Sequence, residues 1–114
     1  MPITTRNLLD QYTENFCRKY MENIKKKVIL YGSYARGDYR DDSDIDIMIL
    51  LDLSDMDIKQ YRHELSDETF DFNMDHDLDI KPIAKSQQHF QNWVDAHPFY
   101  ANVEKEGVKL FEAA

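Results

Sequence analysis

Two aspartates with a single residue between them, Asp44 and Asp46, stand at the start of an apolar run that extends to Leu51. Side chains alternate between faces along a β-strand, so a strand here points both carboxylates to the same side. Neighbouring carboxylates repel each other and are costly to bury without a partner. A divalent cation removes that cost, and Mg²⁺ in proteins typically binds one or two carboxylates together with water and phosphate oxygens. The pair therefore predicts a magnesium site at the mouth of a strand.

A glycine–serine pair, Gly32 and Ser33, directly follows a short apolar run at residues 28–31. A turn at this point offers backbone N–H groups and a hydroxyl, which are the donors that a phosphate group needs. Arg36 lies close enough in sequence to reach triphosphate oxygens, and a solvated side chain explains it equally well. A phosphate-binding turn beside a carboxylate pair on the neighbouring strand indicates a nucleoside triphosphate site.

A further acidic segment, residues 75–83, alternates polar with apolar residues and predicts another strand. The alternation places four side chains on one face: Asp75, Asp77, Asp79 and Lys81. A solvated edge strand accounts for Asp75 and Asp77, since Pro82 suits an edge or a strand end. Lys81 shares a face with Asp79 and is expected to pair with it or to contact phosphate.

The order Gly-Ser, ten residues, then Asp-x-Asp resembles the signature of the DNA polymerase β-like nucleotidyltransferase superfamily. The wording GSYARGDYRDDSDID is most similar to its minimal nucleotidyltransferases, the antitoxins of HEPN/MNT pairs (MntA type). The resemblance runs over residues 28–83, and the ending PFYANVEKEGVKLFE adds to it. It implies a third carboxylate within a short apolar-Asp-apolar pattern. Asp79, between Leu78 and Ile80, matches that pattern best, and Asp77 is the second candidate.

Together, pattern and resemblance predict an α/β fold, a small mixed β-sheet flanked by helices in the manner of polymerase β-like nucleotidyltransferases. The predicted site is a list of six residues: catalytic and metal-binding Asp44, Asp46 and Asp79, and nucleotide-binding Gly32, Ser33 and Arg36. Two Mg²⁺ ions would bind the aspartates, with ATP as substrate. One ion would activate an attacking hydroxyl and the other would stabilise the pyrophosphate leaving group.

Only the resemblance indicates which molecule accepts the nucleotide. It implies a helical HEPN-type partner protein, with AMP transferred to a tyrosine of that toxin, so that this chain acts as an antitoxin. Two alternatives stay open: a small-molecule nucleotidyltransferase completed by a partner subunit, and a non-catalytic module that binds nucleotide or a partner. The base preference and any homo- or hetero-oligomer are left open by the sequence.

Composition limits the remaining classes. The length of 114 residues fits a single nucleotidyltransferase domain over residues 1–114. A net charge of −8 opposes direct nucleic-acid binding, which depends on Lys and Arg at phosphates. No apolar run approaches the length of a membrane span. The single cysteine, Cys17, cannot form an internal disulfide, and a reducing cytoplasm is the simple expectation.

Helices and turns around the site follow from local signals. We expect a first helix capped by Thr4 or Thr5 and ending in the lysines at 25–27, and a second helix over residues 57–72. Gly37 should end one helical turn after the glycine–serine pair. Ser86 should cap a third helix, Pro98 and Gly107 should bound a fourth, and residues 108–111 predict a final strand or docked tail.

Overall fold

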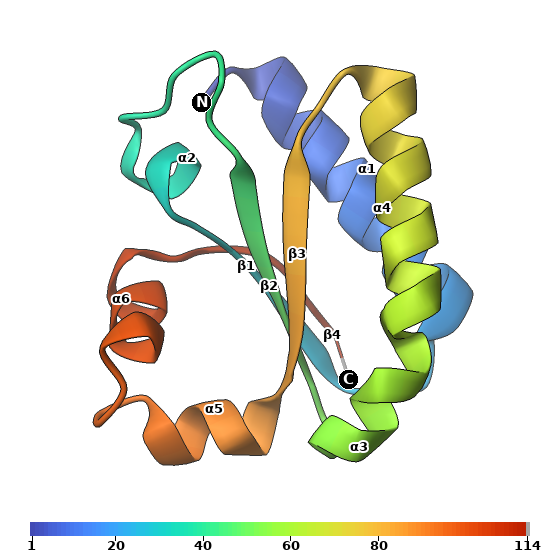
Figure 1. Ribbon diagram of the computed structural model, residues 1–114, viewed down its shortest axis with the longest axis vertical. Helices are drawn as coiled ribbons and strands as arrows, with labels where there is room; N and C mark the ends of the chain where they lie inside the picture. Colours follow the sequence, from blue (N-terminus) through green and yellow to red (C-terminus); the bar gives the residue numbers. More distant parts are fainter. Residues whose placement is uncertain (114) are drawn as a thin grey trace.

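The computed structural model describes residues 1–113 and contains a four-stranded mixed sheet (Figure 1). The strands are β1 (Lys26–Tyr31), β2 (Ile45–Leu51), β3 (Ile80–Ser86) and β4 (Val108–Ala113). Their order across the sheet is β3-β2-β1-β4. β1 is antiparallel to β2 and β4, whereas β2 and β3 run parallel. This confirms the predicted α/β fold with a small mixed sheet.

Helices connect and cover the strands. They are α1 (Ile3–Tyr20), α2 (Ser33–Arg36), α3 (Asp55–Ile58), α4 (Arg62–His76), α5 (Gln87–Trp93) and α6 (Pro98–Glu106), with a 3-10 turn at Lys59–Tyr61. The helix expected over residues 57–72 therefore begins two residues earlier as α3 and continues after the 3-10 turn to His76. Within residues 1–113, no helix has the length and apolar character needed to cross a membrane.

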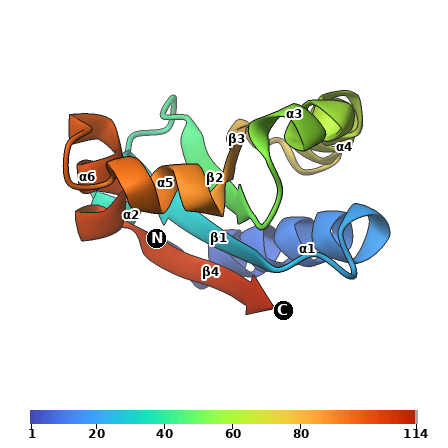
Figure 2. The ribbon, with the colours of Figure 1, turned by 90° about the horizontal axis from the view of Figure 1, so that it is seen from below.

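The two faces of the sheet carry separate apolar cores. Leu9 and Phe16 of α1 pack with Ile47 of β2 on one face, and Phe90 of α5 and Tyr100 of α6 pack on the other. Figure 2 shows α5 and α6 on the opposite side of the sheet from α1. Alternate residues of β2 serve the two cores, so both faces of this strand are covered. By the same alternation Asp46 faces the side of α5 and α6.

Local capping signals are confirmed where they were strongest. Gly37 adopts the left-handed conformation (φ 89°) and ends α2. The Ser86 hydroxyl accepts a hydrogen bond from the His89 N–H at 3.3 Å and begins α5. Pro98 opens α6, and Gly107 follows its last residue. These residues act through their own backbone or side chain, so they are readable from sequence.

The predicted strand over residues 75–83 is wrong in its first half. Helix α4 runs through His76, Asp77 takes a left-handed conformation (φ 53°), and the strand begins only at Ile80. Asp75 and Asp77 therefore do not share a strand face with Asp79. The carbonyl of Asn73 accepts hydrogen bonds from the N–H groups of Asp77 and Leu78, which closes the helix at this point.

The first helix also differs from its prediction. It begins after Pro2, without a threonine cap, and ends at Tyr20. Lys26 belongs to β1 and is only 4% exposed. Its ammonium donates to the carbonyl oxygens of Met21 at 2.6 Å and Ile24 at 2.7 Å. The lysine run thus lies beyond the helix, and Lys26 holds together the loop that leads into β1.

Candidate active site

The glycine–serine turn lies directly against Asp46. Gly32 has a positive φ of 76°, and its carbonyl accepts hydrogen bonds from the N–H groups of Ala35 (3.1 Å) and Arg36 (3.0 Å). Tyr31, the residue before the turn, is paired with Asp46 across β1 and β2. A Cβ atom added at Gly32 would lie 2.4 Å from the Asp46 Oδ2 atom. Glycine is therefore required both by the backbone conformation and by the closeness of the carboxylate.

The other two aspartates meet because β2 and β3 are parallel and begin in register. Ile45 is paired with Ile80, so Asp44 and Asp79 occupy equivalent positions immediately before the two strands. The Ile45 N–H donates to the Asp79 carbonyl at 2.9 Å, and the Asp44 and Asp79 carboxyl groups are close enough to shift each other's pKa. The predicted trio thus gathers at one end of the sheet, the end nearest α2 in Figure 1.

The three aspartates shift one another's pKa values. Hydrogen bonding to Asp79 raises the pKa of Asp44, together with desolvation and the charge of Asp79. That hydrogen bond and Lys81, whose Nζ lies 3.3 Å from the Asp79 Oδ1 atom, lower the pKa of Asp79. Of these two carboxylates, Asp44 is thus the one that binds a proton more readily as the pH falls. Partial burial, followed by the charges of Asp44 and Asp79, raises the pKa of Asp46, although Arg36 opposes the shift.

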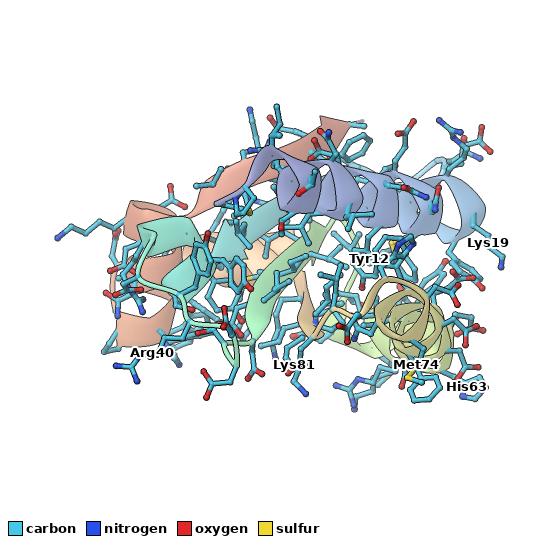
Figure 3. The ribbon with its side chains drawn as sticks, turned by 90° about the horizontal axis from the view of Figure 1, so that it is seen from above. Tyr12, Lys19, Arg40, His63, Met74 and Lys81 are labelled. Carbon is cyan, nitrogen blue, oxygen red and sulfur yellow. The ribbon has the colours of Figure 1, made fainter. Side chains whose placement is uncertain are left out.

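Two cations border the carboxylates. Arg36 donates from Nε to the Asp38 carboxylate at 3.2 Å and from a terminal nitrogen to Glu106 at 3.3 Å. It thus pairs with the loop after α2 and with the end of α6, while its side chain stays 45% exposed. The expected pairing of Lys81 with Asp79 is confirmed. Figure 3 looks down on this end of the sheet, where Lys81 and Arg40 project outward.

A pocket of about 380 Å³ opens beside the glycine–serine turn. Its lining combines predicted residues with residues of α6: Tyr31, Gly32, Ser33, Arg36, Asp46, Phe99, Asn102, Val103 and Glu106. Asp44 does not line it, and Asp79 instead lines a neighbouring hollow of about 250 Å³ that also includes Asp77. The α6 contribution was not predicted, because 70 positions separate Arg36 from Glu106 and no local pattern links them.

The chemistry of these side chains suits a hard cation. Carboxylate oxygens are the ligands that Mg²⁺ prefers, and the charges of the neighbouring aspartates contribute to raising the pKa values of Asp44 and Asp46. Within the described residues 1–113, no group of three or more His, Cys, Asp or Glu side chains is placed so that it could hold a metal ion. A cation bound at these aspartates would need other oxygens, such as those of phosphate and water, among its ligands.

A carboxylate cluster on a small mixed sheet, in contact with a glycine–serine turn, is the arrangement of a nucleotidyltransferase. The family described as "Nucleotidyltransferase domain" matches residues 9–109. The chain belongs to this family, and it is a nucleotidyltransferase.

Two curated relatives come from Methanocaldococcus jannaschii. "Putative protein adenylyltransferase MJ0604" is 40% identical over 96 residues, covering 82% of this chain and 84% of the relative. "Putative protein adenylyltransferase MJ0141" is 31% identical over 84 residues, covering 74% and 77%.

Solved structures share the fold. A crystal structure named as a putative nucleotidyltransferase from Sulfolobus solfataricus aligns with a TM-score of 0.65 and 22% identity, covering 96% of this chain and 82% of that one. A toxin–antitoxin crystal structure with AMP-PNP aligns with a TM-score of 0.56 and 19% identity, covering 91% and 73%. At these identities the likeness establishes the fold alone.

Proposed function

We propose that this protein transfers a nucleoside monophosphate, AMP from ATP, to a hydroxyl group in a Mg²⁺-dependent reaction. The observation that carries the proposal is the closeness of the Gly32 turn to Asp46, at the end of the sheet where Asp44 and Asp79 stand opposite each other. It puts donors for phosphate within reach of acceptors for a cation. An ATP·Mg²⁺ complex presents both kinds of group together.

Each predicted residue has a role in this proposal. Gly32 and Ser33 bind the β- and γ-phosphates, with Arg36 assisting from the same pocket. Asp44, Asp46 and Asp79 would hold two Mg²⁺ ions, which supply Lewis-acid activation of the acceptor hydroxyl and stabilise charge on the leaving pyrophosphate. Binding on these residues fixes the α-phosphorus in line with the acceptor.

The proposed transfer balances as a simple displacement. The acceptor oxygen forms a bond to the α-phosphorus, and the bond between the α-phosphorus and the bridging oxygen breaks, which releases pyrophosphate. Asp79 is our candidate to accept the hydroxyl proton, because it stands beside Asp44 at the start of the parallel strands and its side chain is 52% exposed. Asp79 fits this role better than Asp77, because Asp79 stands opposite Asp44 immediately before β3, whereas Asp77 lies two residues earlier in the left-handed turn after α4.

For the acceptor we propose a tyrosine of a helical HEPN-type toxin, which makes this chain an antitoxin. Two relatives carry protein adenylyltransferase names, which supports a protein acceptor over a small molecule. A toxin–antitoxin pair with AMP-PNP shares the fold, and another structure of this fold is a mutant MntA–HpeT pair. In that mutant two aspartates are each replaced by glutamate. A single residue separates them, as a single residue separates Asp44 from Asp46 here.

The test is transfer of label from α-³²P-ATP. The protein, Mg²⁺ and the product of the adjacent gene are incubated together, and the label is located by gel and by mass spectrometry of tryptic peptides. We expect AMP on a partner tyrosine, lost on chelation and in Asp44→Asn and Asp46→Asn. Asp71→Asn, an exposed aspartate of α4, is the matched control and should transfer normally. Label on a small molecule, or label that persists in both site variants, would overturn the proposal.

A further inference from the structure

The side chain of Asn73, in the last turn of α4, pairs with the backbone of the strand that follows Asp79. Its Nδ2 donates to the Ile80 carbonyl at 3.2 Å, and its Oδ1 accepts from the Ile80 N–H at 2.9 Å. Ile80 is the first residue of β3, which lies at an edge of the sheet. One amide side chain therefore satisfies both backbone groups of the residue next to Asp79, as a neighbouring strand would.

The backbone of Asn73 holds the other end of the same segment. Its carbonyl accepts hydrogen bonds from the N–H groups of Asp77 and Leu78, the latter at 3.1 Å. Asp77 is the residue with the left-handed conformation, where the chain reverses from α4 into β3. A single residue thus fixes both ends of residues 77–80, and Asp79 is the one member of that segment that Asn73 does not bond directly.

Asp79 is itself connected to the other carboxylates through its backbone. Its carbonyl accepts from the N–H of Ile45, the residue between Asp44 and Asp46, at 2.9 Å. Its side chain is 52% exposed, so little packing restrains it. The direction of its carboxylate therefore depends on how firmly the backbone on both sides is held. Helix closure alone would require only the two bonds to the Asn73 carbonyl.

We propose that Asn73 is a positioning residue for the third carboxylate: its amide fixes Ile80 and thereby aims Asp79 at the site formed with Asp44 and Asp46. The inference rests on the proposed function, because it assigns Asn73 a role only through Asp79. Groups that orient metal-binding side chains from a second layer commonly change metal affinity or activity by about 10- to 100-fold. Nothing in the sequence marks Asn73, whose partner is seven residues away in a different element.

The test compares Asn73→Ala with Thr69→Ala, one turn earlier on α4. The Thr69 hydroxyl is buried and hydrogen-bonded to the Tyr12 hydroxyl at 2.6 Å, so its loss removes a bond between α4 and α1 and leaves the Asn73 bonds to Ile80 in place. Figure 3 shows Tyr12 between these helices. We expect Asn73→Ala to lower kcat about tenfold and to raise the Mg²⁺ concentration for half-maximal rate, with KM for ATP nearly unchanged. Thr69→Ala should lower the melting temperature and leave the Mg²⁺ dependence at the wild-type value.

Two readouts do not need turnover. Amide hydrogen exchange should be faster at Ile80 in Asn73→Ala, and Mn²⁺ with a non-hydrolysable ATP analogue, followed by electron paramagnetic resonance, should bind several-fold more weakly. If wild type transfers AMP and Asn73→Ala keeps its kcat and Mg²⁺ dependence, the positioning role is overturned and the function stands. If wild type transfers nothing, the proposed function fails, and unchanged Mn²⁺ affinity in Asn73→Ala then overturns the positioning role as well.

Discussion

The charged groups at the two ends of β1 differ in whether the protein itself compensates their charge. At its start, the ammonium of Lys26 is buried among carbonyl oxygens of the preceding loop, two of which lie within 2.7 Å. At its end, the Gly32 turn abuts Asp46, whose pKa is raised by partial burial and by two neighbouring aspartates. The first charge is compensated by the chain itself. The negative charge of the aspartates around Asp46 is the one that we propose a bound cation compensates.

This difference separates a structural charge from a functional one. A buried group that the protein satisfies internally contributes to folding, and its loss should appear as instability. A cluster of like charges works against folding and is retained for what it binds. Substitutions near Gly32 should therefore lower activity and spare stability, whereas substitution of Lys26 should lower stability and spare activity.

The largest effect should follow Asp46→Asn. Removing one of the clustered carboxylates should reduce AMP transfer by about 10²- to 10³-fold, the scale of losing one preorganised electrostatic group. The pKa of Asp46 is raised in the folded state above its ordinary value of 3.8. Ionisation of Asp46 is therefore less favourable in the folded than in the unfolded chain, and it destabilises the folded state once the pH rises above 3.8. The amide removes that cost, so the melting temperature at pH 7 should stay equal to wild type or rise. A lower melting temperature together with full activity would reverse the assignment.

Gly32→Ala should have the next largest effect, with Gly37→Ala as its matched control. Both glycines have a positive φ, but the strain differs: an alanine at Gly37, which is left-handed (ψ 5°), costs about 1–2 kcal/mol, whereas Gly32 (ψ −154°) lies in a region almost restricted to glycine and costs more. Only at Gly32 does the new Cβ meet the Asp46 carboxylate, whereas nothing lies within 4 Å at Gly37. We expect steady-state kinetics to show a loss of about 10²-fold for Gly32→Ala, and little change for Gly37→Ala. Equal losses in the two variants would show that strain alone matters.

At the other end of the strand, Lys26→Met should affect stability and spare chemistry. Methionine keeps the apolar stem but loses the charged hydrogen bonds to the Met21 and Ile24 carbonyls. The free energy of unfolding, measured in urea, should fall by about 2 kcal/mol. The rate per folded molecule should remain that of wild type. A variant that is stable but inactive would place Lys26 in the site and remove the contrast.

The smallest effect should come from the exposed pair of Lys19 and Glu68, which lies between α1 and α4. A hydrogen bond from Lys19 at 2.6 Å, aided by Tyr20, lowers the pKa of Glu68 below its ordinary value of 4.5. Its contribution is therefore present above pH 4.5 and lost as the pH falls through the lowered value. Glu68→Gln should lower the melting temperature by about 2 °C at pH 7, and by nothing in acid. A shift that grows in acid would contradict the direction of this pKa change.

The site was more predictable than its surroundings because its main signals are local. Gly32, Asp44 and Asp46 stand within 15 residues, and the positive φ and strand alternation act through those residues themselves. The start of β3 was misplaced because alternating aspartates suit a helix end followed by a turn as well as a strand. What decides between them is Asn73, through bonds to Leu78 and Ile80 that no periodicity reveals.

The pocket wall from α6 and the burial of Lys26 depend on contacts distant in sequence. Phe99 and Asn102 reach the pocket only because α6 packs beside α2 and β1, as the bond from Arg36 to Glu106 shows. Lys26 reads as one of three equivalent lysines until the loop folds its carbonyls around it. The partition of the whole chain into one domain and the roles of the site residues stay predictions for experiment.

The most direct measurement is paramagnetic broadening in a ¹⁵N-resolved spectrum on adding Mn²⁺ with a non-hydrolysable ATP analogue. The account predicts that amide signals of Gly32, Ser33, Asp46 and Asp79 broaden first, while that of Lys26, at the far end of β1, stays sharp. Broadening centred on the acidic surface of α4, or none at all, would contradict a nucleotide–metal site at this end of the sheet.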